Sequence, residues 1–220
     1  MRTIIKKIAH PFLRVFASYY FSKPRKYNYK HLKGIVNTGV FHPQFTISTK
    51  LLLDFIDLQN LKDQQLLELG CGTGLISTYA AMKGAKVMAT DINPFAIENA
   101  KLNAENNKVE IITIHSNLFQ NIPQQVFDYI IINPPYYPKA PKNEIEQAWY
   151  CGENFEYFQH LFKTIHSYFD AHSKVVMILS EDCDLEHIQQ LAESHQMVFE
   201  LLEKKRKWGE ENYLFQLKSI

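Results

Sequence analysis

The stretch QLLELGCGTGLISTYAAMKGAKVMATD, residues 65–91, decides the fold of this chain. It begins with an apolar run typical of a buried strand, turns through a glycine-rich segment, and continues as a helix that closes at Gly84. A second strand follows and ends in Asp91. A strand, a helix and a second strand in this order predict a parallel pair of strands and therefore an α/β protein.

The same alternation of apolar runs and amphipathic helices continues to the end of the chain. Strands are predicted at residues 65–70, 86–91, 109–116, 126–133 and 174–180. Helices are predicted at residues 48–56, 74–84, 92–107, 155–169 and 184–195, and an antiparallel hairpin at 197–220 that turns near Gly209. Ser48 or Thr49 is expected to cap the first helix and Asn93 the third. The aromatic residues of helix 155–169 have the spacing of core packing.

Length and composition favour one domain with an appendage. The chain has 220 residues, of which 46% are hydrophobic, enough for one good core. We expect a basic, aromatic-rich N-terminal extension at residues 1–45 and a single α/β domain at residues 46–220.

Cysteine usage and hydropathy predict a cytoplasmic protein. Cys71, Cys151 and Cys183 are too few and too scattered for a disulfide framework or a Cys-x-x-Cys metal site. No apolar run approaches the roughly 18 residues of a membrane span. His10 and Pro11 interrupt the apolar segment that a signal peptide would need. The nine histidines have no clear ligand spacing, so no metal is predicted.

The net charge of +1 conceals a strong asymmetry. Residues 1–53 contain ten Lys or Arg and no acid, which leaves 14 basic and 23 acidic residues from Asp54 onward. Cations interleaved with Ile, Phe and Tyr suit contact with RNA, the ribosome or DNA. Two other interpretations are contact with anionic lipid and a lid whose aromatic residues cover the acidic body. If the head binds nucleic acid, deleting residues 1–33 should weaken that association in a salt-sensitive way.

The glycine-rich turn has the placement of a ligand-binding loop. Gly70, Gly72 and Gly74 follow a strand and open a helix, where a ligand can lie against exposed N–H groups. Leu75 breaks the dinucleotide pattern GxGxxG. Asp91 ends the next strand, where a carboxylate can accept hydrogen bonds from both ribose hydroxyls.

This register resembles S-adenosylmethionine-dependent class I methyltransferases. The resemblance implies a Rossmann-like, mostly parallel seven-stranded sheet with a C-terminal antiparallel hairpin and helices on both faces, and a methyltransferase domain at residues 46–220. It also implies that Glu68 positions the methionine end of the cofactor, that the glycine loop contacts the cofactor, and that Asp91 holds the ribose. Asn117 stands where the family commonly has an Asp for the adenine amine, and the backbone of Leu118 would serve the ring. The implied cofactor-binding set is Glu68, Gly70, Cys71, Gly72, Gly74, Asp91, Ile92, Asn117, Leu118 and Asn133.

The segment VFDYIIINPPYYPK, residues 126–139, ends a predicted central strand with the sequence NPPY. It resembles the motif of methyltransferases that modify a planar amino nitrogen, which implies catalytic roles for Asn133, Pro134, Pro135 and Tyr136. The lone pair of such a nitrogen is delocalised, so the nitrogen is a weak nucleophile. The side-chain oxygen of Asn133 and the carbonyl of Pro134 would accept its two hydrogens and aim the lone pair at the methyl group. Tyr136 would offer a flat face to the acceptor.

The acceptor remains open between two classes of macromolecule. Ala148, Gly152 and Glu153 loosely follow the order found in HemK-type release-factor glutamine methyltransferases, which favours a peptidyl glutamine. The uncharged surroundings of Pro43 and the short basic head depart from that family. An exocyclic amine of adenine or guanine in RNA or DNA is therefore the alternative. A third hypothesis is a non-catalytic S-adenosylmethionine-binding protein that contacts nucleic acid or the ribosome, but such a protein has no need of an intact NPPY motif.

Overall fold

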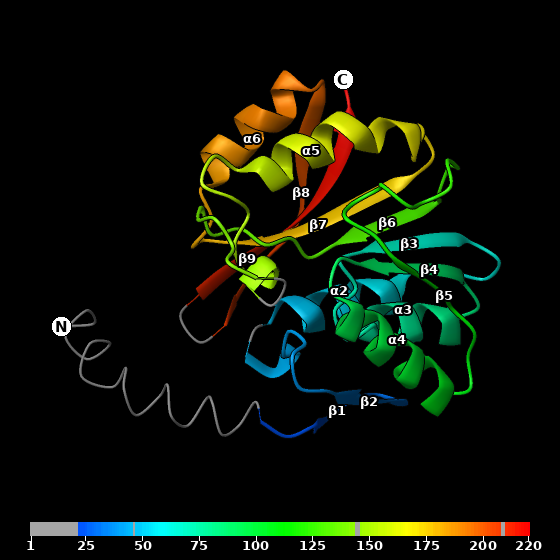
Figure 1. Ribbon diagram of the computed structural model, residues 1–220. Helices are drawn as coiled ribbons and strands as arrows, with labels where there is room; N and C mark the ends of the chain where they lie inside the picture. Colours follow the sequence, from blue (N-terminus) through cyan, green and yellow to red (C-terminus); the bar gives the residue numbers. More distant parts are fainter. Residues whose placement is uncertain (1–21, 46, 144–145, 208–209) are drawn as a thin grey trace.

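The computed structural model describes residues 22–220, apart from 46, 144–145 and 208–209. A seven-stranded sheet with the order β5-β4-β3-β6-β7-β9-β8 forms its centre (Figure 1). Strands β3 to β7 are mutually parallel, and β9 is antiparallel to both β7 and β8. The predicted α/β sheet with its terminal hairpin is confirmed. The strands are β3 (Gln65–Leu69), β4 (Lys86–Asp91), β5 (Ile112–His115), β6 (Tyr129–Ile132), β7 (Lys174–Ser180), β8 (Met197–Lys207) and β9 (Glu210–Ser219).

Helices cover both faces of the sheet, α5 and α6 on one face and α2, α3 and α4 on the other (Figure 1). Each side has its own apolar core, one containing the phenylalanines of α5 and the other the leucines of α2. The core assignment of the aromatic stripe is confirmed, since Phe158 and Phe162 are fully buried. The helices are α2 (Ser48–Leu58), α3 (Leu75–Met82), α4 (Pro94–Asn106), α5 (Glu156–Thr164) and α6 (Leu185–Ser194), with short 3-10 turns η1 (Pro43–Phe45), η2 (Glu146–Ala148) and η3 (Ile165–Ser167).

The register of the central strands brings their carboxyl ends to one edge of the sheet. Leu69 of β3 lies opposite Thr90 of β4 on one side and Ile132 of β6 on the other. The residues that follow these strands therefore meet at the same edge, where open α/β sheets bind their ligands. All four residues of β6 are buried, as its unbroken apolar sequence predicts.

Of the two predicted helix caps, one is confirmed and one is wrong. The Asn93 side chain accepts a hydrogen bond from the Phe95 N–H and caps α4. Helix α2 instead begins after Ile47, which makes no side-chain cap, and Ser48 and Thr49 are its first two residues. Ser48 lies inside the first turn and not at the cap position, and its hydroxyl accepts a hydrogen bond from the Asn133 amide.

A two-stranded hairpin precedes the main sheet, and the sequence pattern did not predict it. Strands β1 (Arg25–Tyr29) and β2 (Leu32–Val36) pair antiparallel. Three asparagines four residues apart, two in α4 and one at its C-cap, bind the outer edge of β2 and its continuation as a neighbouring strand would. Asn107 binds the N–H and C=O of Lys33, Asn103 those of Ile35, and Asn99 accepts from Asn37 N–H and donates to Ile35 C=O. This asparagine ladder fixes the hairpin on the body.

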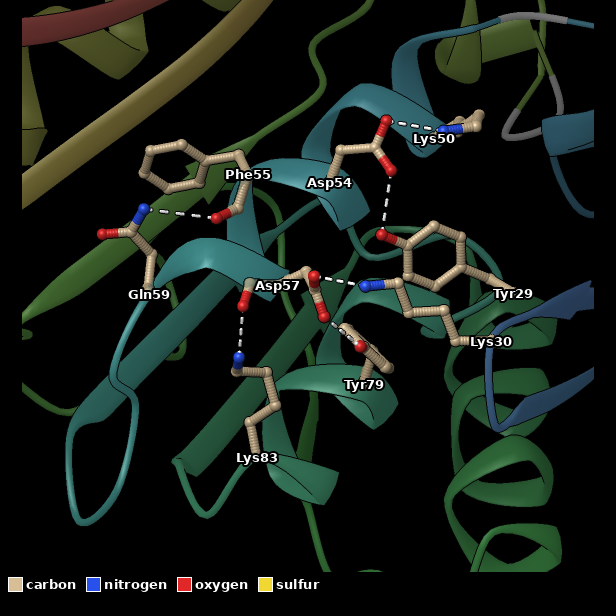
Figure 2. Close-up of polar contacts among 9 residues, drawn as sticks. All are labelled: Tyr29, Lys30, Lys50, Asp54, Phe55, Asp57, Gln59, Tyr79 and Lys83. Carbon is tan, nitrogen blue, oxygen red and sulfur yellow. Dashed lines mark hydrogen bonds and ion pairs between the residues drawn. The ribbon is translucent and has the colours of Figure 1, made fainter.

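The hairpin also meets α2 through polar contacts (Figure 2). The Tyr29 hydroxyl donates to Asp54 at 2.9 Å, and Lys30 forms an ion pair with Asp57. The ammonium of Lys30 holds the pKa of Asp57 below its usual range. In residues 25–36 the basic head thus acts as a cover on the acidic body, one of the three interpretations of its charge.

Two sequence predictions fall outside the described residues. These are the nucleic-acid or lipid contact of the basic head, as far as it falls on residues 1–21, and the hairpin turn near Gly209. Within the described part of the chain, no helix combines the length and apolarity needed to cross a membrane.

Candidate active site

A cleft of about 440 Å³ lies along the carboxyl ends of β3, β4 and β6. Its volume is in the range of pockets that hold a nucleoside-sized ligand. A smaller cavity of about 70 Å³ adjoins it and shares Gly70, Asp91 and Asn133 with it. The predicted residues that line the larger cleft are Gly70, Asp91, Ile92, Asn117, Leu118, Asn133 and Pro135. Those that line the smaller cavity are Glu68, Gly70, Cys71, Gly72, Asp91 and Asn133.

The glycine loop forms an open cradle on the cleft. Gly70 and Gly72 have φ values of +76° and +51°, a conformation that side chains disfavour. A Cβ placed on either glycine would point into open space, so a ligand can lie directly against this backbone. Gly74 has a different role, because its Cβ would lie 2.4 Å from that of Ala100. It permits α3 to pack on α4 and is not among the described residues that line the two cavities.

Asp91 is fixed at the point where the two cavities meet. Its Oδ2 accepts a hydrogen bond from the Gly72 N–H and its Oδ1 one from the Asn93 N–H, both at 2.8 Å. Burial raises the pKa of Asp91, and these two donors oppose that rise. Each carboxylate oxygen has a second lone pair, so the pair of oxygens can still accept two hydroxyl hydrogens.

Glu68 is a buried carboxyl group beneath the glycine loop. Its Oε2 accepts a hydrogen bond from the Ser77 N–H at 2.8 Å and another from the Ser77 hydroxyl. Burial dominates these donors and raises the pKa of Glu68 to about 8. A cation in the small cavity would reverse this effect, because an opposite charge favours the ionised carboxylate.

The segment after β5 forms the opposite rim of the larger cleft. Ser116 donates a hydrogen bond to the Leu118 carbonyl at 2.8 Å and accepts one from the Asn121 N–H at 3.0 Å. Leu118 has a φ of +48°, so its backbone is turned by this closed loop. Asn117 and Leu118 both line the cleft next to Ile92.

The end of β6 presents Asn133 to both cavities. Its Nδ2 donates to the Ser48 hydroxyl at 3.3 Å, which fixes the amide and leaves Oδ1 as an acceptor. Pro134 is buried, and Pro135 lines the larger cleft.

Tyr136 packs on the core beside Tyr137, with 4.7 Å between ring centroids. Burial raises the pKa of Tyr136, whose hydroxyl has a hydrogen bond with Ser180. Pro134 and Tyr136 are absent from the described lining of both cavities.

The sequence patterns did not predict most of the residues that line the cavities opposite the glycine loop and the NPPY motif. Tyr150, Tyr157 and Gln147 line the larger cleft, and burial and the charge of Asp91 raise the pKa of Tyr157. Phe41 lines the small cavity and packs on Trp149, with ring centroids 5.0 Å apart. The order Ala148, Gly152, Glu153 gave the only signal, and all three residues line a cavity.

The chain is similar to known proteins both in sequence and in fold. A chain from Methanocaldococcus jannaschii, provisionally named a protein N5-glutamine methyltransferase, is 44% identical over 100 residues, 45% of this chain and 49% of that relative. The ribosomal RNA small subunit methyltransferase C of Buchnera aphidicola is 36% identical over 126 residues, 56% of this chain and 38% of that relative. The chain thus spans about half of the first relative's length and less of the second's.

A solved T. thermophilus 16S ribosomal RNA N2 methyltransferase, in complex with AdoMet and guanosine, has the same fold. Its TM-score is 0.64 at 15% identity, over 88% of this chain and 50% of that one. The family model described as Methyltransferase small domain matches residues 32–150, more than half of the sequence. The chain belongs to the methyltransferase small domain family.

Proposed function

We propose that this protein is an S-adenosylmethionine-dependent N-methyltransferase that acts on a planar amino nitrogen of a macromolecule, with the carboxamide of a protein glutamine as the favoured acceptor. The observation that carries the proposal is the position of Asn133. Its amide is held by Ser48 and borders both the nucleoside-sized cleft and the small cavity beneath the glycine loop.

The residues present fit the cofactor. Gly70 and Gly72 leave their backbone open to a ligand, and Asp91 retains acceptor capacity for ribose hydroxyls. Glu68 offers a carboxyl group that a methionine ammonium would ionise. When bound, S-adenosylmethionine supplies an electrophilic methyl group on a sulfonium. The T. thermophilus protein of the same fold was solved with this cofactor, which supports the assignment.

The chain's own contribution to the reaction is to hold the acceptor amine. The Oδ1 of Asn133 and the carbonyl oxygen of Pro134 would each accept one N–H and turn the nitrogen lone pair toward the cleft. Both acceptors bind more strongly as positive charge grows on the nitrogen, which lowers the barrier. The methylated nitrogen carries a positive charge and is strongly acidic, so it releases its extra proton to solvent and no strong base is required.

The glutamine acceptor is supported by the M. jannaschii relative. The test is incubation of the purified protein with methyl-labelled S-adenosylmethionine and a cell extract, followed by digestion with protease or nuclease. We expect the labelled macromolecule to be destroyed by protease and to yield N5-methylglutamine on hydrolysis by proteases. Absence of any labelled macromolecule, with cofactor binding intact, would contradict the enzyme assignment and favour a binding protein.

A base in RNA is the second candidate function. The Buchnera relative, named for ribosomal RNA, covers more of this chain than the glutamine methyltransferase relative does. The cations of the head, Arg2, Lys6, Lys7 and Arg14 among them, would hold flanking phosphates. A nuclease-sensitive product would support this candidate, and removal of residues 1–21 should then weaken RNA binding more at low salt than at high salt. Deletion of residues 1–21 is preferable to deletion of residues 1–33, because the longer deletion would also remove β1.

A further inference from the structure

Asn212, near the start of β9, is a buried polar residue that the proposed reaction has not yet used. Its side chain is 4% exposed, and its amide Nδ2 has no hydrogen-bond partner among the described residues. A buried donor without an acceptor destabilises the fold, and native proteins retain few of them. Those that remain call for an explanation such as a functional role or a bound water or ion.

The backbone register places Asn212 on the same face and the same edge of the sheet as Asn133. Side chains alternate along a strand, and Leu214, two residues later, packs in the core on the α2 side. Asn212 therefore points to the α2 side as well. Asn133 is also on this side, since its amide binds Ser48 at the start of α2. Asn212 lies opposite Ser180, the last residue of β7.

The backbone spacing between the two asparagines leaves room for one small planar group. Strand β7 separates β6 from β9, and the register sets Asn212 two residues further along than Asn133, which puts their Cα atoms roughly 12 Å apart. Two asparagine side chains, two hydrogen bonds of about 2.9 Å and a carboxamide between them reach up to about 15 Å when extended, so they bridge this distance in a bent arrangement. The two sites also have opposite polarity, since Asn133 offers an acceptor and Asn212 a donor.

The polar neighbours of Asn212 already have partners of their own. The Ser180 hydroxyl accepts a hydrogen bond from the Asp182 N–H at 3.2 Å and also contacts Tyr136 and Glu210. Lys205, opposite Asn212 on β8, forms an ion pair with Glu203 at 3.0 Å. The amide donor of Asn212 is thus left for a bound molecule.

We infer that Asn212 is an acceptor-recognition residue whose Nδ2 donates a hydrogen bond to the carbonyl oxygen of the carboxamide that is methylated. This inference rests on the proposed function. Asn133 and the Pro134 carbonyl bind the two N–H groups of the carboxamide, and Asn212 binds its oxygen. A carboxylate side chain has no N–H to donate to the Asn133 oxygen or the Pro134 carbonyl, so it is rejected at those two positions although its oxygen could accept from Asn212.

The test compares Asn212→Leu and Asn212→Asp with wild type and with Asn60→Asp, a control at an exposed residue beyond α2. Initial rates of label transfer to the extract's protein acceptor give kcat/KM, calorimetry gives the S-adenosylmethionine Kd, and thermal melting gives stability. We expect both Asn212 variants to lower kcat/KM at least tenfold with less than a twofold change in the cofactor Kd. Asn212→Leu should melt at or above the wild-type temperature, because it removes an unsatisfied donor.

The possible results separate the two hypotheses. Unchanged kcat/KM in Asn212→Leu would overturn the role of Asn212 while leaving the proposed function intact. A lower melting temperature with activity lost only in proportion to the folded fraction would also overturn it, since that is a structural role. Failure of wild-type protein to label any protein acceptor would instead contradict the proposed function.

Discussion

The two halves of the site are built in different ways. The cofactor side comes from one continuous segment, residues 65–91, in which the strand, the loop and the acid follow each other in sequence. The acceptor side combines Asn133 from β6, Ser48 from α2 and, by inference, Asn212 from β9. A contiguous side is fixed by local geometry, whereas an assembled side depends on tertiary packing. Changes on the two sides should therefore affect different measurements.

The change that separates the halves most sharply is Asn133→Ala. It removes the side-chain acceptor for the amine, so methyl transfer should fall about 10³-fold, as for loss of a transition-state hydrogen bond. The S-adenosylmethionine Kd should stay within about twofold, because the ribose and methionine contacts remain. Label-transfer rates and calorimetry measure the two quantities, with Asn60→Ala as the exposed control. Turnover like that of wild type would remove Asn133 from the mechanism.

Glu68 tests how much the buried carboxyl group on the cofactor side destabilises the fold when it ionises. Its folded pKa of about 8 exceeds the unfolded value of 4.5, so the folded protein retains a proton that the unfolded chain loses between these pH values. Stability from this group is complete below pH 4.5 and declines as the pH rises toward 8. Relative to Glu68→Gln, the wild type should lose about 3 kcal/mol of unfolding free energy between roughly pH 5 and 8. Urea unfolding of both proteins at both pH values measures this difference. An equal change in unfolding free energy for the two proteins would contradict the raised pKa of Glu68.

Asp91→Ala should act on cofactor binding in particular. Loss of the ribose acceptor should raise the S-adenosylmethionine Kd about 100-fold, with a smaller loss of stability from the freed Gly72 and Asn93 N–H groups. Asp128→Ala is the matched control, because Asp128 also accepts a backbone hydrogen bond, from Gln65 at 2.7 Å, but at the opposite end of β3. Equal effects of the two variants on the Kd would mean that Asp91 acts only through the fold.

Asn103→Ala tests whether the asparagine ladder also supports the glycine loop on the cofactor side. Asn103 is fully buried, and its amide also donates to the Thr73 carbonyl in the glycine loop at 2.8 Å. Its loss should reduce stability by about 2 kcal/mol and weaken cofactor binding a few-fold. Asn107→Ala, at the more exposed rung of the ladder, should cost less and leave the cofactor Kd unchanged. Chemical unfolding and calorimetry distinguish the two rungs.

The sequence predicted what local patterns encode. The apolar runs of β3 and β6 and the glycines between β3 and α3 define the sheet and the loop, and the Asn93 cap follows from a short-range preference. The β1–β2 hairpin was missed because amides on α4, more than 60 residues away, hold its outer edge. The contact between Ser48 and Asn133 was missed for the same kind of reason, since the two residues are distant in sequence. Tyr150 and Tyr157 reach the cleft only through the path of the loop after β6.

The asparagine ladder has a geometric limit. Four residues of helix rise about 6.0 Å, while two residues of strand rise about 6.6 Å, so the two scales drift apart by about 0.6 Å at each rung. Over three rungs the accumulated drift stays near the range of distances that a hydrogen bond tolerates. Position 95, where a fourth rung would stand, is a phenylalanine close to Gly39. The ladder also occupies the edge of β2 that a second molecule would otherwise extend into a larger sheet. A helix with correctly spaced amides thereby closes one edge of a hairpin without adding a strand.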